Sequence, residues 1–147
     1  TEANRIDTSV TSEHIRHLAK FINDLDGSVF YAYPRLEAIS NRYTKLNYRY
    51  TLVPTNPPFD GEVNLIPAGY FKYELYEVSW ISADVTLTTL TAPATETQVL
   101  PVNDLNGVVQ GLVAIGKLYL GEKAGSEEVQ YTEYTPPVTE NTIYYGQ

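Results

Sequence analysis

The chain has 147 residues, a size that fits one domain with a sizeable core, and it contains no cysteine. Disulfides and thiolate metal sites are therefore excluded, and no run of about 18 apolar residues predicts a membrane span. The net charge of −8 lies entirely in residues 73–147, since residues 1–72 carry eight basic and eight acidic side chains. This acidic half argues against direct nucleic-acid binding and favours docking on a basic protein surface.

Composition favours strands. Thirteen tyrosines and abundant Thr and Val are typical of β-structure. Residues 1–13 show no apolar period and no signal-peptide pattern, and we expect an N-terminal arm there.

Residues 14–25 are compatible with two structures. Apolar side chains recur at helical spacing, with Ser12 as a possible N-cap. The following segment 23–27 resembles a tight turn that ends at Gly27, before the strand-like segment 28–33. We favour a strand–turn–strand hairpin over the helix.

The next segment alternates after a connection at 35–41. Between Arg42 and Val53, even-numbered positions such as Leu46 and Tyr48 are apolar and are predicted to face the core. Three prolines and Gly61 make 54–61 a loop, and a short strand is predicted at 62–66.

Residues 65–80 form the strongest strand signal of the chain. Phe71, Tyr73 and Leu75 share one face at period two, and then the apolar phase shifts by one residue to Tyr76, Val78 and Trp80. This shift predicts a bulge, or a strand that passes from one packed surface to another. We expect the second set to lie on a different packed surface, and we predict that it contributes to an interface with a neighbour.

The remaining pattern predicts strands at 84–91 and 97–102, a hairpin signal at Asn106-Gly107, and a buried strand at 108–120 beside the 65–80 strand. Gly111 and Gly116 within that strand indicate a bend or a close backbone approach. The tail, 123–147, mixes acidic residues with tyrosines and is predicted to add strands to this sheet or to a neighbour. Its predicted interface residues are Tyr131, Tyr134, Tyr144 and Tyr145.

Residues that carry chemistry are sparse. His14 and His17 would share a helix face but have no third metal ligand at suitable spacing. Asp24 and Asp26 resemble the opening of a calcium loop, although turn chemistry explains them more simply. No nucleophile, phosphate-cradling loop or carboxylate pair is evident, so we predict neither an enzyme nor a cofactor.

Two sets of sequence segments resemble known protein families. Gly69-x-Phe71-x-Tyr73 resembles an immunoglobulin F strand, which implies an antiparallel Ig-like β-sandwich over residues 14–122 with extended N- and C-terminal arms. The ordered phrases at 21–27, 31–34, 40–45, 68–77 and 115–118 resemble small virion structural proteins of tailed bacteriophages, including crAss-like phages.

That resemblance implies a capsid auxiliary or decoration protein that is made in the host cytoplasm and incorporated into the virion. It would contact the major capsid protein, other virion proteins and copies of itself, but neither nucleic acid nor a membrane. Two alternatives remain open: a neck, tail or head-fibre component, and a carbohydrate-binding β-sandwich module that uses exposed tyrosines or Trp80.

Overall fold

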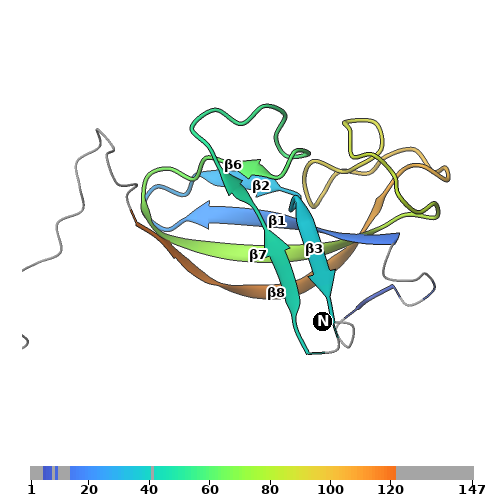
Figure 1. Cartoon of the computed structure of the whole chain (residues 1–147), viewed down its shortest axis with the longest axis horizontal. Coiled ribbons are helices and arrows are strands. Elements are labelled where there is room, and N and C mark those ends of the chain that lie inside the picture. The colour runs from blue at the N-terminus through green and yellow to red at the C-terminus, as the bar shows by residue number, and fades with distance from the viewer. Residues whose placement is uncertain (1–4, 8, 10–13, 41, 122–147) are drawn as a thin grey trace, which may run out of the picture.

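The computed structural model describes residues 5–7, 9, 14–40 and 42–121, and the regular elements among them are eight β-strands (Figure 1). Within this part of the chain, no helix is long and apolar enough to cross a membrane. The prediction of an all-β fold is confirmed.

The main sheet has four antiparallel strands in the order β2-β1-β7-β8. Their bounds are β1 Ile15–Asn23, β2 Val29–Ala32, β7 Gly69–Ser79 and β8 Val108–Leu120. β7 pairs with β1 along nine residues without interruption, and with β8 along its whole length. The predicted strand at 65–80 is thus an inner strand of the sheet, and it pairs with 108–120 as expected.

The hairpin at the start of the domain is also confirmed. β1 and β2 are joined by a turn in which Gly27 adopts a φ of 77°, a left-handed conformation that glycine tolerates best. Asn23 holds the turn, because its Oδ1 accepts a hydrogen bond of 2.7 Å from the N–H of Leu25. Residues 15–23 therefore form a strand despite their helical apolar spacing.

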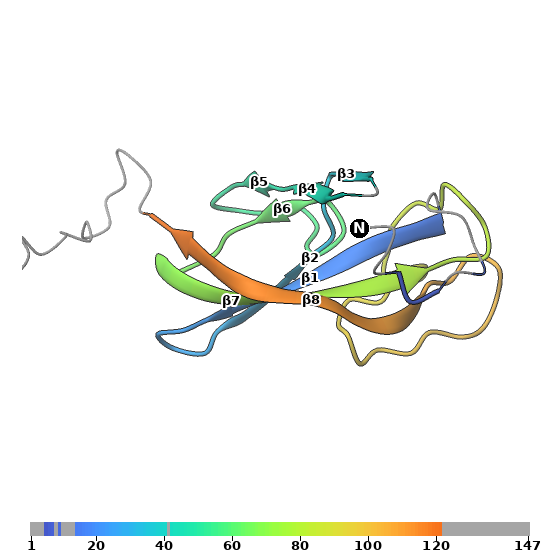
Figure 2. The ribbon, with the colours of Figure 1, turned by 90° about the horizontal axis from the view of Figure 1, so that it is seen from below.

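Four short strands form a layer over one face of the sheet (Figure 2). They are β3 Leu36–Ile39, β4 Thr44–Asn47, β5 Arg49–Tyr50 and β6 Glu62–Val63. β3 pairs antiparallel with β4, whereas β5 and β6 pair in parallel. The expectation of a plain connection at 35–41 is wrong, since it contains β3, and the predicted strand at 42–53 is divided at Tyr48. The loop at 54–61 is as expected.

The first core cluster lies between this layer and the sheet. Its buried members are Ala19, Phe21, Ala32, Val63, Leu65 and Phe71. Within it, Phe21 meets the edge of the Tyr48 ring, with 5.7 Å between centroids. As predicted, Leu46, Tyr48 and Tyr50 are less exposed than their odd-numbered neighbours, but Leu52 is 64% exposed.

A second core cluster lies on the opposite face, at the other end of the sheet. Its buried members are Leu18, Tyr33, Val78, Trp80 and Ala92. Its cover is the segment 81–107, which contains no strand, so the predictions of strands at 84–91 and 97–102 and of a hairpin at Asn106-Gly107 are wrong. Threonine side chains bond to the local backbone there, as when Thr91 Oγ1 donates to the carbonyl of Thr86 at 2.6 Å.

The phase shift in β7 has a clear structural counterpart. The register with β8 slips between Leu75 and Tyr76 and again between Glu77 and Val78, and β8 contributes the extra residues Val113 and Gln110. Phe71, Tyr73 and Leu75 belong to the first cluster, whereas Tyr76, Val78 and Trp80 belong to the second. The prediction that the strand passes from one packed surface to another is confirmed.

β8 differs from its prediction in one respect. It lies beside β7, but it is an edge strand whose residues alternate between half-buried and exposed, so the expectation of a fully buried strand is wrong. Its glycines behave as predicted: a Cβ at Gly116 would lie 2.5 Å from the Tyr73 hydroxyl, and Gly111 has a φ of 149° beside a bulge.

Candidate interaction surface

Two of the three predicted interface residues of β7 are buried by the chain itself. Val78 is 0% and Trp80 is 3% exposed, while Tyr76 is half-buried. The Trp80 indole Nε1 donates to the carbonyl of Thr91 at 2.8 Å, and Gly107 leaves room for the ring. The second packed surface of β7 is therefore the domain's own core. The predicted interface tyrosines 131, 134, 144 and 145 lie outside the described residues.

The two calcium candidates have turn and ion-pair roles. Asp24 forms an ion pair with Lys117 across the sheet, and Asp26 Oδ1 accepts the N–H of Ser28 at 2.9 Å. Hydrogen bonds from Ser28 lower the pKa of Asp26. The described residues contain no group of three or more His, Asp or Glu side chains able to hold a metal.

The two histidines have different environments. His14 Nδ1 lies 3.3 Å from the carbonyl of Trp80, and His17 Nδ1 lies 2.9 Å from Glu37 Oε1. Glu37 also accepts hydrogen bonds from Arg16 Nε at 2.9 Å and from the N–H of His17 at 3.1 Å. This cluster connects β3 to the part of β1 that does not pair with β2. The nearly buried Glu37 carboxylate has hydrogen-bond partners there, and we assign the cluster a structural role.

A second buried carboxylate escaped sequence reasoning. Glu77, which is 0% exposed, accepts hydrogen bonds from the backbone N–H groups of Ile6, at 2.9 Å, and Asp7, at 2.6 Å. Ser79 Oγ donates to Asp7 Oδ2 at 2.9 Å. Residues 5–7 of the predicted arm are thus held against the sheet. An acidic side chain at an inward position of β7 was the one available signal.

A polar network joins the segment 81–107 to the sheet. Lys20 Nζ lies 2.6 Å from Glu96 Oε2, and the Tyr31 hydroxyl donates a hydrogen bond to Glu96 Oε1. Burial alone would raise the pKa of Glu96, but the hydrogen bonds from Lys20 and Tyr31 outweigh it and lower that pKa. The bond to Glu96 raises the pKa of Lys20.

The same network continues along β7. Glu74 accepts a hydrogen bond of 2.6 Å from the Tyr76 hydroxyl and forms an ion pair of 2.9 Å with Lys72. These two contacts lower the pKa of Glu74. Burial and the bond to Glu74 raise the pKa of Tyr76. The centre of this face thus contains charged side chains that are paired with one another. The exposed apolar side chains of the same face lie mainly on the edge strand, β8.

That apolar surface lies on the face of the sheet opposite the β3–β6 layer. We define the uncovered sheet surface as Tyr70, Leu112, Ile115 and Tyr119, which are between 48% and 60% exposed. Tyr70 pairs with Tyr119 in the ladder, and their ring centroids are 4.9 Å apart at an interplanar angle of 56°. No described segment covers these side chains.

The free edge of β8 borders this surface. One side of β8 pairs with β7, and no described strand pairs with the other side. Ala114–Leu120 pairs with Gly69–Leu75 without a bulge, and Lys117 is its only charged residue. An apolar, unpaired edge without a bulge is suited to pairing with another chain.

A hollow of about 410 Å³ opens on the other side of the molecule. Its lining mixes apolar residues such as Leu36 and Val85 with the charged residues Arg16, Arg35 and Glu37. Its lining also includes His14, Ser82 and Asp84, and no hydrogen bond joins these three side chains in the described part of the chain.

Comparison of the chain with models of protein families, with curated proteins and with solved structures gives no match. The uncovered sheet surface and the free edge of β8 lie beside each other on the main sheet.

Proposed function

We propose that this chain is a structural protein of an assembled particle, and specifically an auxiliary protein of a tailed-bacteriophage capsid. It would act through contacts with neighbouring proteins rather than by catalysis. The observation that carries this proposal is the uncovered sheet surface together with the free edge of β8. The resemblance of the ordered sequence segments to small virion proteins is the reason for proposing a phage capsid as the particle.

The physical basis is the cost of leaving such a surface in water. Apolar side chains at 48–60% exposure lie on one face of two adjacent strands, with Lys72 and Lys117 between the Tyr70–Tyr119 pair and Ile115. Burying apolar area yields about 25 cal/mol per Å². The β8 edge adds backbone groups that can extend the ladder into a neighbour. A contact of about 1,600 Å² repeated over a shell would stiffen it.

We further propose that the fold is a variant of the Ig-like sandwich. The β3–β6 layer over the main sheet, with a buried cluster between them, supports a two-layer arrangement. In this reading β8 is the strand at which a neighbouring sheet would be added.

The proposal is tested by charging the surface. Leu112→Lys and Ile115→Lys together should leave the fold intact, because both side chains are exposed, but should reduce incorporation into particles or self-association at least tenfold. A matched control is Val99→Lys with Val102→Lys, which places the same charges on side chains that are 90% and 94% exposed in segment 81–107. The readouts are stoichiometry in purified particles and sedimentation velocity. Unchanged incorporation and association in the Leu112/Ile115 variant would overturn the proposal.

Copy number separates the shell from the other virion positions. Hundreds of copies per particle support a capsid auxiliary protein, whereas six or twelve support a neck, tail or fibre component.

A carbohydrate-binding module is the second candidate, and the exposed pair Tyr70 and Tyr119 favours it because aromatic rings stack on apolar sugar faces. Trp80 does not serve that role, since it is buried. Glycan binding that is lost on Tyr70→Ala, with self-association intact, would support this function over the structural one.

A further inference from the structure

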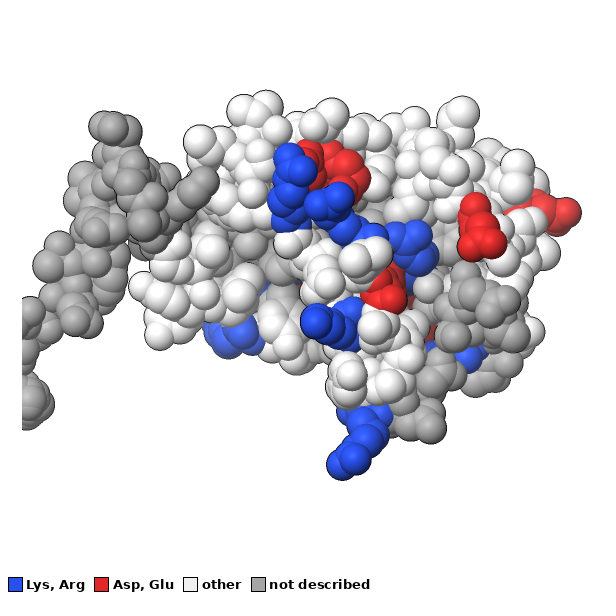
Figure 3. Space-filling view, in the orientation of Figure 1, with Lys and Arg blue, Asp and Glu red and all other residues white. Residues whose placement is uncertain are grey.

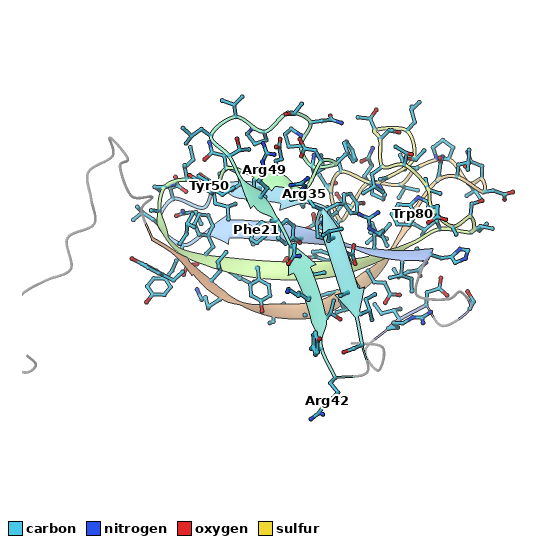
Figure 4. The ribbon with its side chains drawn as sticks, in the orientation of Figure 1. Phe21, Arg35, Arg42, Arg49, Tyr50 and Trp80 are labelled. Carbon is cyan, nitrogen blue, oxygen red and sulfur yellow. The ribbon has the colours of Figure 1, made fainter. Side chains whose placement is uncertain are left out.

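The outer surface of the β3–β5 strands is basic. Space-filling shows Lys and Arg gathered over this layer (Figure 3). We define the basic surface as Arg35, Arg42, Lys45 and Arg49, all of which are exposed. Lys45 and Arg49 point outward from β4 and β5 at period two, and Arg42 extends from the tip of the β3–β4 hairpin (Figure 4).

Most of this positive charge is not neutralised. Arg49 pairs with Glu62 at 2.9 Å, but no carboxylate among the described residues lies within ion-pair distance of Arg35, Arg42 or Lys45. By contrast, Lys20, Lys72 and Lys117, on the opposite face of the sheet, are each paired. Three free cations on one face of a chain with net charge −8 indicate a surface that favours an acidic partner.

Apolar side chains are interleaved with these cations. Leu36 is 67% and Tyr43 is 60% exposed, and the paired residues Leu36 and Asn47 share the outer face with Lys45. The hollow of about 410 Å³ adjoins the basic surface, because Arg35 and Leu36 line it. Its volume is within the range that accepts an aromatic side chain. Glu37, which also lines it, is already compensated by Arg16.

The chain itself contains a segment of the complementary composition. Residues 122–147 contain five glutamates against one lysine, and four tyrosines. This segment follows β8 directly and has 26 residues, and an extended chain of that length spans up to about 85 Å. Acidic side chains suit the free cations, and tyrosines suit both the hollow and the arginine planes.

We propose that the basic surface and the adjoining hollow bind the acidic, tyrosine-rich segment 122–147 of a second copy. This inference rests on the proposed function and adds a second contact between copies, separate from the uncovered sheet surface. Each copy then offers a tail to one neighbour and a basic surface to another. Such a heterologous contact builds a ring or an open chain of subunits.

The interleaved apolar residues favour a protein segment over nucleic acid as the occupant. Binding to phosphates needs dense positive charge, whereas the whole chain is strongly acidic and would repel a polyanion beyond the patch. Nucleic-acid binding is included as an outcome of the test.

The test uses two full-length variants that each lack one half of the contact. The surface variant is Arg42→Glu with Lys45→Glu, two exposed positions. The tail variant is Glu127→Gln, Glu128→Gln, Glu133→Gln and Glu140→Gln. The matched control, Leu90→Glu with Val99→Glu, Val102→Glu and Leu105→Glu, changes the net charge by the same amount as the surface variant, but at exposed positions of segment 81–107. Circular dichroism checks that each variant is folded.

Sedimentation velocity at low salt measures association. The wild type should associate, and its association should weaken as salt increases. The surface and tail variants should each associate about tenfold more weakly, because several exposed ion pairs together are worth about 1.4 kcal/mol. An equimolar mixture of the two variants should form heterodimers, since the intact tail of one meets the intact basic surface of the other.

Four results would overturn the proposal. They are a mixture that contains no heterodimer, an equal loss in the segment 81–107 control, unchanged association in both variants, and binding of a labelled single-stranded DNA that the surface variant abolishes. Unchanged association leaves the proposed structural function standing, with its contacts elsewhere. A wild type that neither associates nor enters particles removes that function as well.

Discussion

On one face of the main sheet the cover is built of strands, and on the other it is the irregular segment 81–107. β3 and β4 hold each other through a backbone ladder, and β5 with β6 do the same. The segment 81–107 is instead anchored by a few side chains: Trp80 to Thr91, Tyr33 to Pro93, and Lys20 with Tyr31 to Glu96. Both clusters consist of buried side chains, but the second depends on single anchors. Single substitutions should therefore release the segment 81–107 more selectively than the strand layer.

The largest expected effect comes from the centre of each cluster. Phe71→Ala and Trp80→Ala should each lower the free energy of unfolding by about 3–5 kcal/mol, because both side chains are buried and leave a cavity. In hydrogen-exchange measurements, Trp80→Ala should reduce protection most around the segment 81–107, since it also removes the donor to Thr91. Phe71→Ala should reduce protection throughout the sheet. Identical exchange patterns would show that the two covers are not independently anchored.

A smaller effect is expected where the loop passes over the tryptophan. A Cβ at Gly107 would lie 2.5 Å from Trp80 Cε2, so Gly107→Ala should cost about 1–3 kcal/mol in urea denaturation as the ring is displaced. Gly121→Ala is the control, because its Cβ would meet only Tyr119 Cε2 at 3.8 Å, an ordinary contact. Equal stability of the two variants would mean that the loop yields without disturbing the ring.

The smallest effect concerns the Glu96 anchor and depends on pH. The pKa of Glu96 is lowered in the folded state, so its contribution is present above the unfolded value of about 4.3 and is lost as pH falls through the folded value. Glu96→Gln should therefore cost up to about 1 kcal/mol at pH 7 and give a shallower acid decline in stability. Asp104→Asn, at an exposed position of the same segment, is the control. A wild-type decline retained in full by Glu96→Gln would contradict this assignment.

The local sequence pattern predicts much of the main sheet. The alternation and the turn residues at 23–27 predict β1 and β2, and the phase shift after Leu75 predicts the change of packed surface in β7. By contrast, the residues 84–91 alternate like a strand but form none, because Thr88 and Thr91 bond to the nearby backbone and Pro93 follows. Propensity cannot register that competition, since it depends on where the chain goes next.

The surfaces were harder to predict than the strands. Whether β8 is central or at an edge depends on the order of strands in the sheet, which no short window of sequence contains. The apolar run at 108–120 therefore indicated burial when half of it is exposed. The sequence pattern predicts an interface role for Trp80, but residues of segment 81–107, which show no regular period, cover its ring within the domain. The basic surface combines Lys45 and Arg49 on separate strands with Arg35 and Arg42 in the adjoining loops, which no short window of sequence brings together.

The hydrogen bonds between Glu77 and residues 5–7 have a consequence for anyone who shortens this chain. A version that begins at β1 would keep every strand, yet it would remove both N–H donors from a carboxylate with no exposure to water. Removing the partner of a buried charge costs about 3–5 kcal/mol, and less where the cut lets water reach Glu77. The ribbon outline thus understates the minimal folding unit, and a trimmed version would need a neutral residue at position 77 to be well behaved.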